Sequence, residues 1–174
     1  PLSDGGDGFC KILTESRQGR LYKEKVHGPR FKLVDALLGV VELERLEPEL
    51  QEWLMVPPKG KISIIEMAQA SGLHHLAQDE RDLWHTTTVG VGELIARSVE
   101  LKSDALLIGV GGSATNDLGL GTLEALGLQF ISSQDKPINQ LTPAGWETVE
   151  RLGGTIPTNL PPIRIACDVK NPLL

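Results

Sequence analysis

The stretch Asp104-Ala-Leu-Leu-Ile-Gly-Val-Gly-Gly-Ser-Ala-Thr-Asn-Asp117 decides the predicted fold. Its first part, Ala105 to Val110, is a short and nearly unbroken apolar run, which is typical of a strand buried on both faces of a parallel sheet. The run ends at the adjacent glycines Gly111 and Gly112, and residues 118–126 then carry a helical pattern. Strand, glycine loop and helix in this order predict an α/β fold, in which loop N–H groups can surround an anion at the helix N-terminus.

The glycine loop matches no strong nucleotide-binding signature. It lacks the lysine of a Walker A loop, and Gly109, Gly111 and Ala114 fit only the weak G-x-G-x-x-A variant of the dinucleotide fingerprint. A tight turn without a ligand is therefore one interpretation. A turn needs no cluster of small polar residues, so ligand binding is favoured by the four that follow: Ser113, Thr115, Asn116 and Asp117. The alternative for Asn116 or Asp117 is that it only caps the helix.

The composition sets limits on the class of protein. A length of 174 residues suits one domain or slightly more, and 40% hydrophobic with only 4% aromatic residues predicts an aliphatic core. The net charge of −6 without a basic block argues against nucleic acid or an anionic membrane as partner. No apolar run has membrane-spanning length, and no signal-peptide pattern is present. Cys10 and Cys167 lie far apart in the sequence, which favours reduced thiols in a cytoplasmic protein.

The N-terminal segment, Pro1-Leu-Ser-Asp-Gly-Gly-Asp-Gly8, is a glycine-rich loop with the two carboxylates Asp4 and Asp7. It does not match the EF-hand pattern, whose acidic positions alternate and end in a distant glutamate. A helix is expected from Phe9, because apolar residues recur there at helical spacing until Gly19. Asp7 is then either the N-cap of this helix or, like Asp4, a group that binds a metal or a substrate hydroxyl. Both chain ends look cut, since no methionine precedes Pro1 and the chain stops after a strand-like run.

Apolar periodicity predicts the remaining elements. Strands are expected at 20–26, 31–41, 61–67, 128–132 and 163–169, and helices at 91–99 and 142–152. The second of these strands is either continuous or a hairpin around Gly39. The glutamate-rich residues 42–52 indicate a solvated surface connection. The four histidines have no metal-ligand spacing, so a zinc site is not expected.

Three carboxylates fall at the carboxyl end of a predicted strand or in the loop after one: Glu66, Asp117 and Asp168. In open α/β sheets this edge is where ligands bind. Glu66 stands out, because a carboxylate at the end of an apolar strand costs free energy unless it is paired or used. Thr86, Thr87 and Thr88 precede a helix that starts near Gly90. Helix capping by Thr88 is the favoured interpretation, and a second ligand-facing loop is the alternative.

Five stretches, in this order, resemble the bacterial-type (type I) glycerate kinases. Each motif is weak alone, but together they span nearly the whole chain, which makes the combined resemblance specific. In the first stretch the family usually has glutamate where this chain has Asp7, a departure that keeps the carboxylate. The stretches are Pro1–Gly8, Glu66–Leu73, Thr88–Ile95, Ile108–Asp117 and Ala166–Leu173.

The resemblance implies the ATP-dependent phosphorylation of D-glycerate to phosphoglycerate with Mg²⁺. It also implies a mixed sheet flanked by helices, in a two-domain enzyme about twice this length with its active site between the domains. Residues 1–22 would belong to a discontinuous Rossmann-like domain, and residues 23–174 to an inserted second α/β domain that is incomplete at its C-terminal end. The expected partner is the small-molecule substrate, D-glycerate.

The resemblance also suggests roles for individual residues. Substrate or phosphate binding is expected from Ser3, Gly5, Gly6, Gly111, Gly112, Ser113, Thr115 and Asn116. Catalytic roles are expected from Asp4, Asp117 and Asp168, one of which would orient the attacking hydroxyl as a base. Mg²⁺ would be held by carboxylates, with Asp117 and Asp168 as the expected ligands. The alternatives are a folded but non-catalytic fragment, or a nucleotide-binding module of another class. A dinucleotide module is disfavoured, because no acidic residue ends a strand about 20 residues after the glycine loop.

Overall fold

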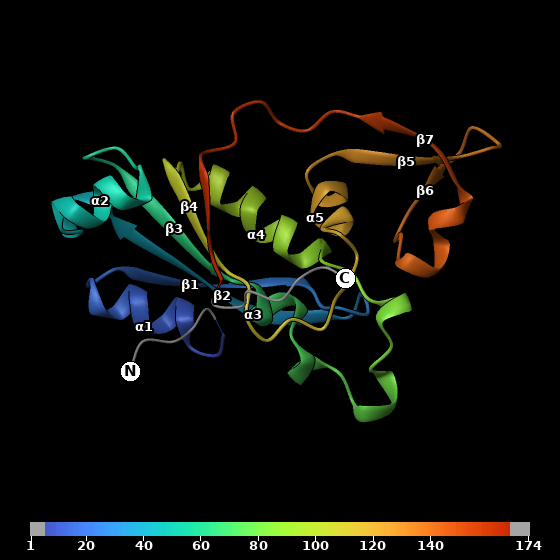
Figure 1. The fold of residues 1–174 in the computed structure, drawn as a ribbon, viewed down its shortest axis with the longest axis horizontal. Helices are drawn as coiled ribbons and strands as arrows, with labels where there is room; N and C mark the ends of the chain where they lie inside the picture. Colours follow the sequence, from blue (N-terminus) through green and yellow to red (C-terminus); the bar gives the residue numbers. More distant parts are fainter. Residues whose placement is uncertain (1–5, 168–174) are drawn as a thin grey trace.

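The computed structural model describes residues 6–167 and arranges them around two β-sheets (Figure 1). The larger sheet has the strand order β1-β2-β3-β4-β8. The first three strands are antiparallel neighbours, whereas β3, β4 and β8 run parallel. This confirms the expected α/β fold with a mixed sheet. The strand bounds are Arg20–His27 (β1), Leu33–Glu42 (β2), Lys61–Glu66 (β3), Ala105–Gly109 (β4) and Ile163–Ala166 (β8).

Helices cover both faces of this sheet, as expected from the resemblance. Helix α4 connects β3 to β4 and packs on one face, while α1 and the segment that contains α2 pack on the other (Figure 1). The α-helices are α1 (Phe9–Ser16), α2 (Pro48–Leu54), α3 (Met67–Ser71), α4 (Val89–Glu100) and α5 (Leu120–Ala125). Short 3₁₀ turns are η1 (Leu43–Arg45), η2 (Leu73–His75), η3 (Gln78–Glu80), η4 (Leu83–His85) and η5 (Pro143–Thr148).

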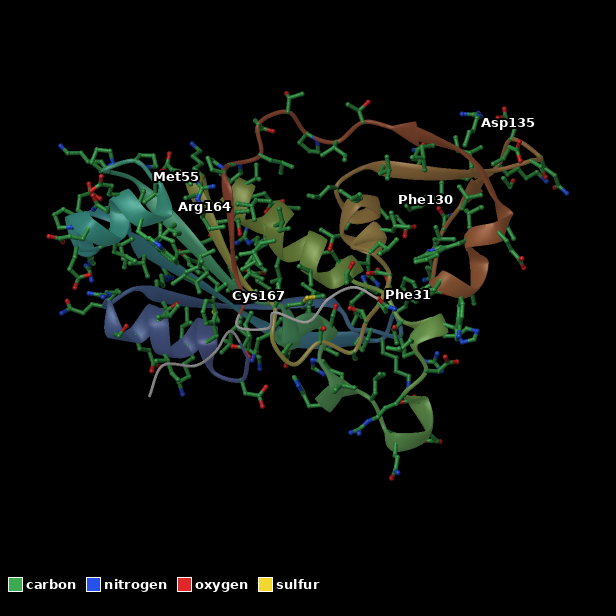
Figure 2. The ribbon with its side chains drawn as sticks, in the orientation of Figure 1. Phe31, Met55, Phe130, Asp135, Arg164 and Cys167 are labelled. Carbon is green, nitrogen blue, oxygen red and sulfur yellow. The ribbon has the colours of Figure 1, made fainter. Side chains whose placement is uncertain are left out.

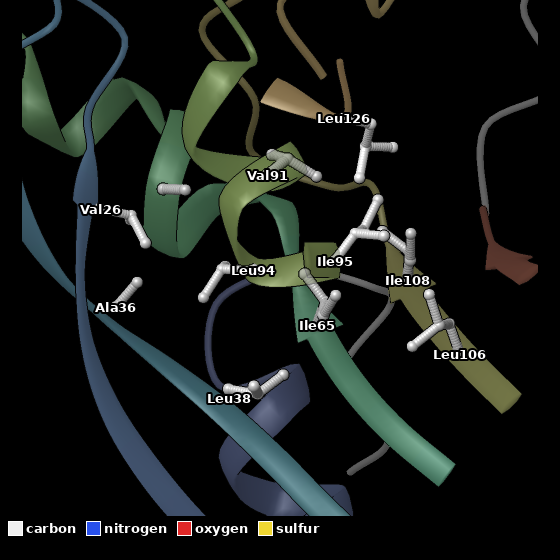
Figure 3. Close-up of a cluster of buried hydrophobic side chains, with 11 residues drawn as sticks. Val26, Ala36, Leu38, Ile65, Val91, Leu94, Ile95, Leu106, Ile108 and Leu126 are labelled. Carbon is white, nitrogen blue, oxygen red and sulfur yellow. The ribbon is translucent and has the colours of Figure 1, made fainter. Parts of the chain in front are cut away.

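The central strand β3 shows why an unbroken apolar run is needed here. Successive side chains of a strand point to opposite faces, so Ile62 and Ile64 join the α1 side while Ile65 joins the α4 side. On the α4 side, Ile65 packs with Leu106 and Leu94 in the cluster drawn in Figure 3. All of these residues are almost completely buried. The burial of a Leu or Ile side chain contributes roughly 1.5–3 kcal/mol, so this two-faced core is the main stabilising feature of the sheet.

Helix α1 lies close against the sheet, and Gly39 in β2 makes this possible. A Cβ atom at Gly39 would lie 1.8 Å from Thr14 Oγ1 of α1. The predicted segment 31–41 is therefore one continuous strand with a glycine at a helix contact, and the hairpin turn lies instead between β1 and β2. The predicted domain boundary after residue 22, which falls within β1, stays a prediction.

The smaller sheet lies at one end of the molecule and has the order β6-β5-β7 (Figure 1). Its strands are β5 (Leu128–Ser132), β6 (Pro137–Ile138) and β7 (Val149–Gly154). Phe130 of β5 is buried, whereas Asp135 sits in the turn at the far end of this sheet (Figure 2).

The helix predicted for residues 142–152 is wrong in its second half. Helical structure ends at Thr148, and the next six residues pair with β5 as an antiparallel strand. The residues after Thr148 favour a strand because Val149 is β-branched and the glycines at 153 and 154 are poor helix formers. Pairing with β5 then overrides the helical spacing of Trp146, Val149 and Leu152.

Strand β8 forms one edge of the larger sheet and is incompletely covered. It pairs with β4, and the described residues supply no strand on its other side. Ile165 is 65% exposed and borders a mostly apolar groove of about 450 Å³ between α1, α2 and β8. Arg164 reaches across to the end of α2, where it donates hydrogen bonds to the carbonyl groups of Leu54 and Met55 (Figure 2). Within residues 6–167, no helix combines the length and the apolar character needed to cross a membrane.

Candidate functional site

The candidate site lies at the carboxyl edge of the three parallel strands. Glu66 at the end of β3 is in register with Gly109 of β4, which is in register with Ala166 of β8. The loops that follow these strands therefore emerge side by side, which is the ligand-binding edge of open α/β sheets. Figure 2 shows Cys167, the residue after β8, at this edge.

The glycine loop after β4 is hydrogen-bonded to the end of α3 and the segment that follows it. The Ala114 N–H donates to the Ser71 carbonyl oxygen (2.8 Å), and the Leu73 N–H donates to the Gly112 carbonyl oxygen (3.2 Å). Gly112 has φ = 70°, a conformation that favours glycine, and it is exposed. The N–H groups of Gly111 and Gly112 donate to no acceptor among residues 6–167. Within residues 6–167, the loop thus presents two backbone donors without an acceptor on a fixed frame, a feature that anion-binding nests share.

Asp7, in the described end of the N-terminal segment, lies at the same place. A Cβ atom at Gly112 would lie 3.4 Å from Ala68 Cβ and 4.0 Å from Asp7 Oδ1. Residues 6–8, 66–73 and 108–117, which are far apart in the sequence, therefore meet at one point of the sheet edge. Gly6 is buried and Asp7 is exposed. Ser3, Asp4 and Gly5 lie outside the described residues, so their expected roles stay predictions.

Glu66 is paired within the fold, which is how its carboxylate is tolerated at the end of β3. It is completely buried and accepts hydrogen bonds from the N–H groups of Gly8 (3.2 Å) and Cys10 (3.1 Å) and from Gln69 Nε2 (3.3 Å). Its negative charge lies at the positive N-terminal end of α1, which is a favourable interaction. Glu66 therefore fixes the start of α1 and the preceding residue, Gly8.

Cys10 is an inert part of the same arrangement. Burial, reinforced by the nearby Glu66 carboxylate, raises the pKa of the Cys10 thiol to about 12. The thiol donates to the Ile64 carbonyl oxygen (3.2 Å). A thiol held in its neutral form is a poor nucleophile, so Cys10 has a structural role.

Asp117 connects the first turns of α4 and α5. Its side chain is 2% exposed, and Oδ2 accepts from the Thr88 N–H (2.8 Å), the Thr88 hydroxyl (2.9 Å) and the Gly121 N–H (3.1 Å). Oδ1 accepts from the Gly119 N–H (3.1 Å). Four donors converge on one carboxylate, which indicates a positioning role for Asp117. Its predicted catalytic role stays a prediction.

The same contacts change the expected position of an anion. The Thr88 hydroxyl accepts from the Thr122 N–H (3.0 Å), and Asp117 accepts from the Gly121 N–H, so protein groups already cap the first turn of α5. The sequence predicted an anion at this helix N-terminus. The structure instead closes the helix end with the chain's own Asp117 carboxylate, while the N–H groups of Gly111 and Gly112 have no acceptor among the described residues.

The threonine segment is buried, and Thr88 does more than start a helix. Thr88 occupies the N-cap position of α4, but its side chain makes no capping hydrogen bond to α4 and caps α5 instead. A Cβ atom at Gly121 would lie 2.2 Å from Thr87 Oγ1, so the glycine is required by close packing. The sequence analysis did not predict the contact between Thr88 and Asp117. The one hint in the sequence was that both residues occur in stretches that carry the family resemblance.

Metal-ligating side chains do not form a cluster among the described residues. Residues 6–167 contain no group of three or more His, Cys, Asp or Glu side chains that could hold a metal ion. Asp117 already accepts four hydrogen bonds, and Asp168 lies outside the described residues. Thr115 and Asn116, which were expected to bind phosphate, follow the glycine loop, and the buried Thr115 hydroxyl has no hydrogen-bond partner among the described residues. Their roles and the metal roles stay predictions.

Comparison with known proteins gives a consistent result. All residues of the chain, 1–174, match the profile of the glycerate kinase family. A glycerate kinase of Haemophilus influenzae is 37% identical over 99% of this chain, and a glycerate 2-kinase of Escherichia coli K12 is 34% identical over all of it. A solved structure from Salmonella typhimurium LT2, a candidate glycerate kinase 2, superimposes with a TM-score of 0.79 at 35% identity and covers 99% of the chain. The chain spans 42% of the length of the two enzymes and 43% of that structure.

Proposed function

Because the chain belongs to the glycerate kinase family, we propose that it is part of an enzyme that transfers a phosphoryl group from ATP to a hydroxyl of D-glycerate, with Mg²⁺ as the metal. One observation carries the proposal. The glycine loop after β4 presents N–H donors that have no acceptor among residues 6–167, at the carboxyl edge of the parallel strands and next to Asp7 and the segment after α3.

The chemistry asked of such a site is mainly positioning and charge neutralisation, because phosphoryl transfer needs little covalent work from the protein. Gly111 and Gly112 would donate hydrogen bonds to phosphate oxygens or to the glycerate carboxylate, with the Ser113 hydroxyl beside them. Asp117 would keep the loop in place through Thr88. Asp4 or Asp168 would orient the attacking hydroxyl. Mg²⁺, when bound, would neutralise charge on the phosphate oxygens.

The proposal includes the rest of the protein. Because the chain spans less than half of its relatives, we infer that further parts of the active site come from outside residues 1–174. In this arrangement residues 1–22 belong to one domain and 23–174 to the second, with the site in the cleft between them. The enzyme would act in the cytoplasm on a small molecule.

A coupled assay of ADP release with D-glycerate, ATP and Mg²⁺ tests the proposal on the complete protein and on the 174-residue chain. We expect turnover by the complete protein. Gly112→Ala forces a side chain into φ = 70° and moves the donors of the loop, so kcat/KM should fall at least about 10-fold. Gly153→Ala in β7 is the matched control, because its added Cβ would be crowded by the flexible end of Ile131 (2.8 Å) and would make ordinary contacts at 3.8 Å with the side chains of Arg151 and Gln129.

The outcomes separate the alternatives. Turnover by the complete protein but not by the 174-residue chain would make this chain a non-catalytic part of the enzyme. An inactive complete protein would overturn the proposed function. Equal activity of Gly112→Ala and Gly153→Ala would remove the glycine loop from the mechanism.

A further inference from the structure

Next to the glycine loop lies a hollow of about 320 Å³ that the proposed mechanism does not use. Three of its lining side chains are large, apolar and exposed: Leu83 (54%), Trp84 (63%) and Leu118 (73%). Clustered exposed apolar side chains of this size mark binding surfaces more often than plain surface. We call it the aromatic hollow, and its lining residues are Leu83, Trp84, Asn116, Leu118, Pro143 and Trp146.

The two indole rings come from turns that the fold holds in place. Asp82 accepts from the Trp84 N–H (3.0 Å) and pairs with His85 Nδ1 (2.6 Å), while Arg30 donates to the His85 carbonyl oxygen (3.1 Å). The turn η4, which carries Trp84, also contacts η5, which carries Trp146. The exposed Trp84 ring therefore belongs to an ordered turn.

Leu118 is also held outward by its surroundings. Its φ of 54° is unfavourable for a branched side chain, and the hydrogen bond from the Gly119 N–H to Asp117 bridges over it. Strained residues of this kind persist where the surrounding structure fixes them, and they cluster at ligand sites. The indole N–H of Trp146 is buried and has no acceptor among the described residues.

One segment of the chain contributes to both the glycine loop and the aromatic hollow. Asn116 and Leu118 line the hollow, and Ser113 lies five residues before Leu118, a distance of at most about 18 Å for an extended chain. An extended nucleotide can bridge this distance with its phosphates at the free N–H groups and its base in the hollow. A purine is flat and apolar on its faces, so its chemistry matches a hollow lined by two indole rings.

We propose that the aromatic hollow binds the purine base of the nucleotide, with Trp84 as a stacking platform. This inference rests on the proposed function, because it assumes that a nucleotide occupies the glycine loop. A volume near 320 Å³ is at the lower end for ligand sites and suits a base better than a whole nucleotide. The phosphates would remain at Gly111 and Gly112.

Tryptophan fluorescence can test the hollow directly, because the chain has only three tryptophans. Trp53 in α2 lies on the groove next to β8, so Trp53→Phe leaves indoles only in the hollow. In this background we expect adenosine to change the fluorescence. Trp84→Ala should weaken ATP binding, measured by calorimetry, about 5- to 100-fold, as expected for loss of a stacked base. Inorganic tripolyphosphate has no base, so its affinity should be unchanged.

Two further variants serve as controls for the stacking interpretation of Trp84→Ala. Trp84→Phe keeps a stacking ring and should retain ATP affinity within about 3-fold, whereas an effect as large as that of Trp84→Ala would contradict stacking. Leu152→Ala removes another exposed apolar side chain, in β7, and should leave ATP binding unchanged. Circular dichroism of each variant identifies any failure to fold.

The base site and the proposed function can fail separately. If adenosine is without effect and Trp84→Ala binds ATP as tightly as its parent, the base site is wrong while phosphate binding stands. If adenosine binds in the hollow but neither ATP turnover nor tripolyphosphate binding is found in the complete protein, the base site stands and the kinase proposal falls. Absence of adenosine, ATP and tripolyphosphate binding by the complete protein would overturn both.

Discussion

Removal of the Asp117 carboxylate is the most informative single change for the architecture of this site. In Asp117→Ala the donors that lose their acceptor are the N–H groups of Thr88, Gly119 and Gly121 and the Thr88 hydroxyl. The hydroxyl can turn to another acceptor, which leaves three N–H groups, two of them in buried bonds. A buried unsatisfied donor costs about 1–3 kcal/mol, so the substitution should cost about 3–5 kcal/mol in the free energy of unfolding after some relaxation.

Asp117→Asn provides an internal comparison. The amide oxygen can take the place of Oδ2 and keep the Thr88 and Gly121 bonds, while the amide NH₂ group meets the Gly119 N–H. Only one bond is lost, together with the charge, so a cost of about 1–2 kcal/mol is expected. The measurement is the urea midpoint and slope by circular dichroism. Asp79→Ala, an exposed carboxylate in η3, is the control and should change the free energy of unfolding by less than about 0.5 kcal/mol.

The result that would refute this reasoning is a loss below about 1 kcal/mol for Asp117→Ala. It would mean that the four hydrogen bonds are not made in solution or are replaced by water. A large loss for Asp117→Ala with a nearly unchanged Asp117→Asn would identify the acceptor geometry, and not the charge, as the important property. Because domains are stable by only about 5–15 kcal/mol, the alanine variant is also expected to be more easily digested by proteases.

Four further predictions concern α1 and the two cysteines. Glu66→Ala leaves the buried N–H of Cys10 without an acceptor, so it should lower the free energy of unfolding by about 2–4 kcal/mol. Amide hydrogen exchange should then rise first in α1. Unchanged exchange protection in α1 would contradict the capping role of Glu66. Gly39→Ala should lower the free energy of unfolding by about 1–3 kcal/mol, because the added Cβ clashes with Thr14. In a double-mutant cycle, adding Thr14→Ala should recover part of this loss. Additive losses would exclude the contact. At pH 8 a thiol reagent should modify Cys167 but not Cys10 in the folded chain, and reaction at both would show that Cys10 is accessible. Because its pKa is raised to about 12, the stabilising contribution of the neutral Cys10 thiol is complete below pH 9 and is lost between pH 9 and 12.

The parts of the fold that sequence could predict are those set by local patterns. The apolar runs at 61–66 and 105–109 give β3 and β4 because both faces of these strands are buried. The apolar pattern gave a wrong prediction around Val149, where helical and strand spacing compete. Val149 lies three residues from both Trp146 and Leu152. Helical spacing was satisfied there, and the strand partner that decided the outcome lies 17 or more residues earlier in β5.

The candidate site was predictable in part for the same reason. The glycines at 111 and 112 and the carboxylate at 66 carry local signals, since each interrupts or ends an apolar strand. The pairing of Thr88 with Asp117 spans 29 residues, and nothing local distinguishes a carboxylate that binds a ligand from one that binds backbone N–H groups. The aromatic hollow could not be predicted at all, because its two tryptophans lie 62 positions apart in separate turns.

The uncovered strand β8 affects how this chain should be handled as a separate polypeptide. Its outer edge carries backbone donors and acceptors that no described strand satisfies, and its exposed isoleucines, Ile163 and Ile165, add apolar surface beside them. Such an edge is a template for pairing with the same edge of another copy. A preparation of the isolated 174 residues should therefore self-associate as its concentration rises, and a charged residue at position 165 should improve its solubility.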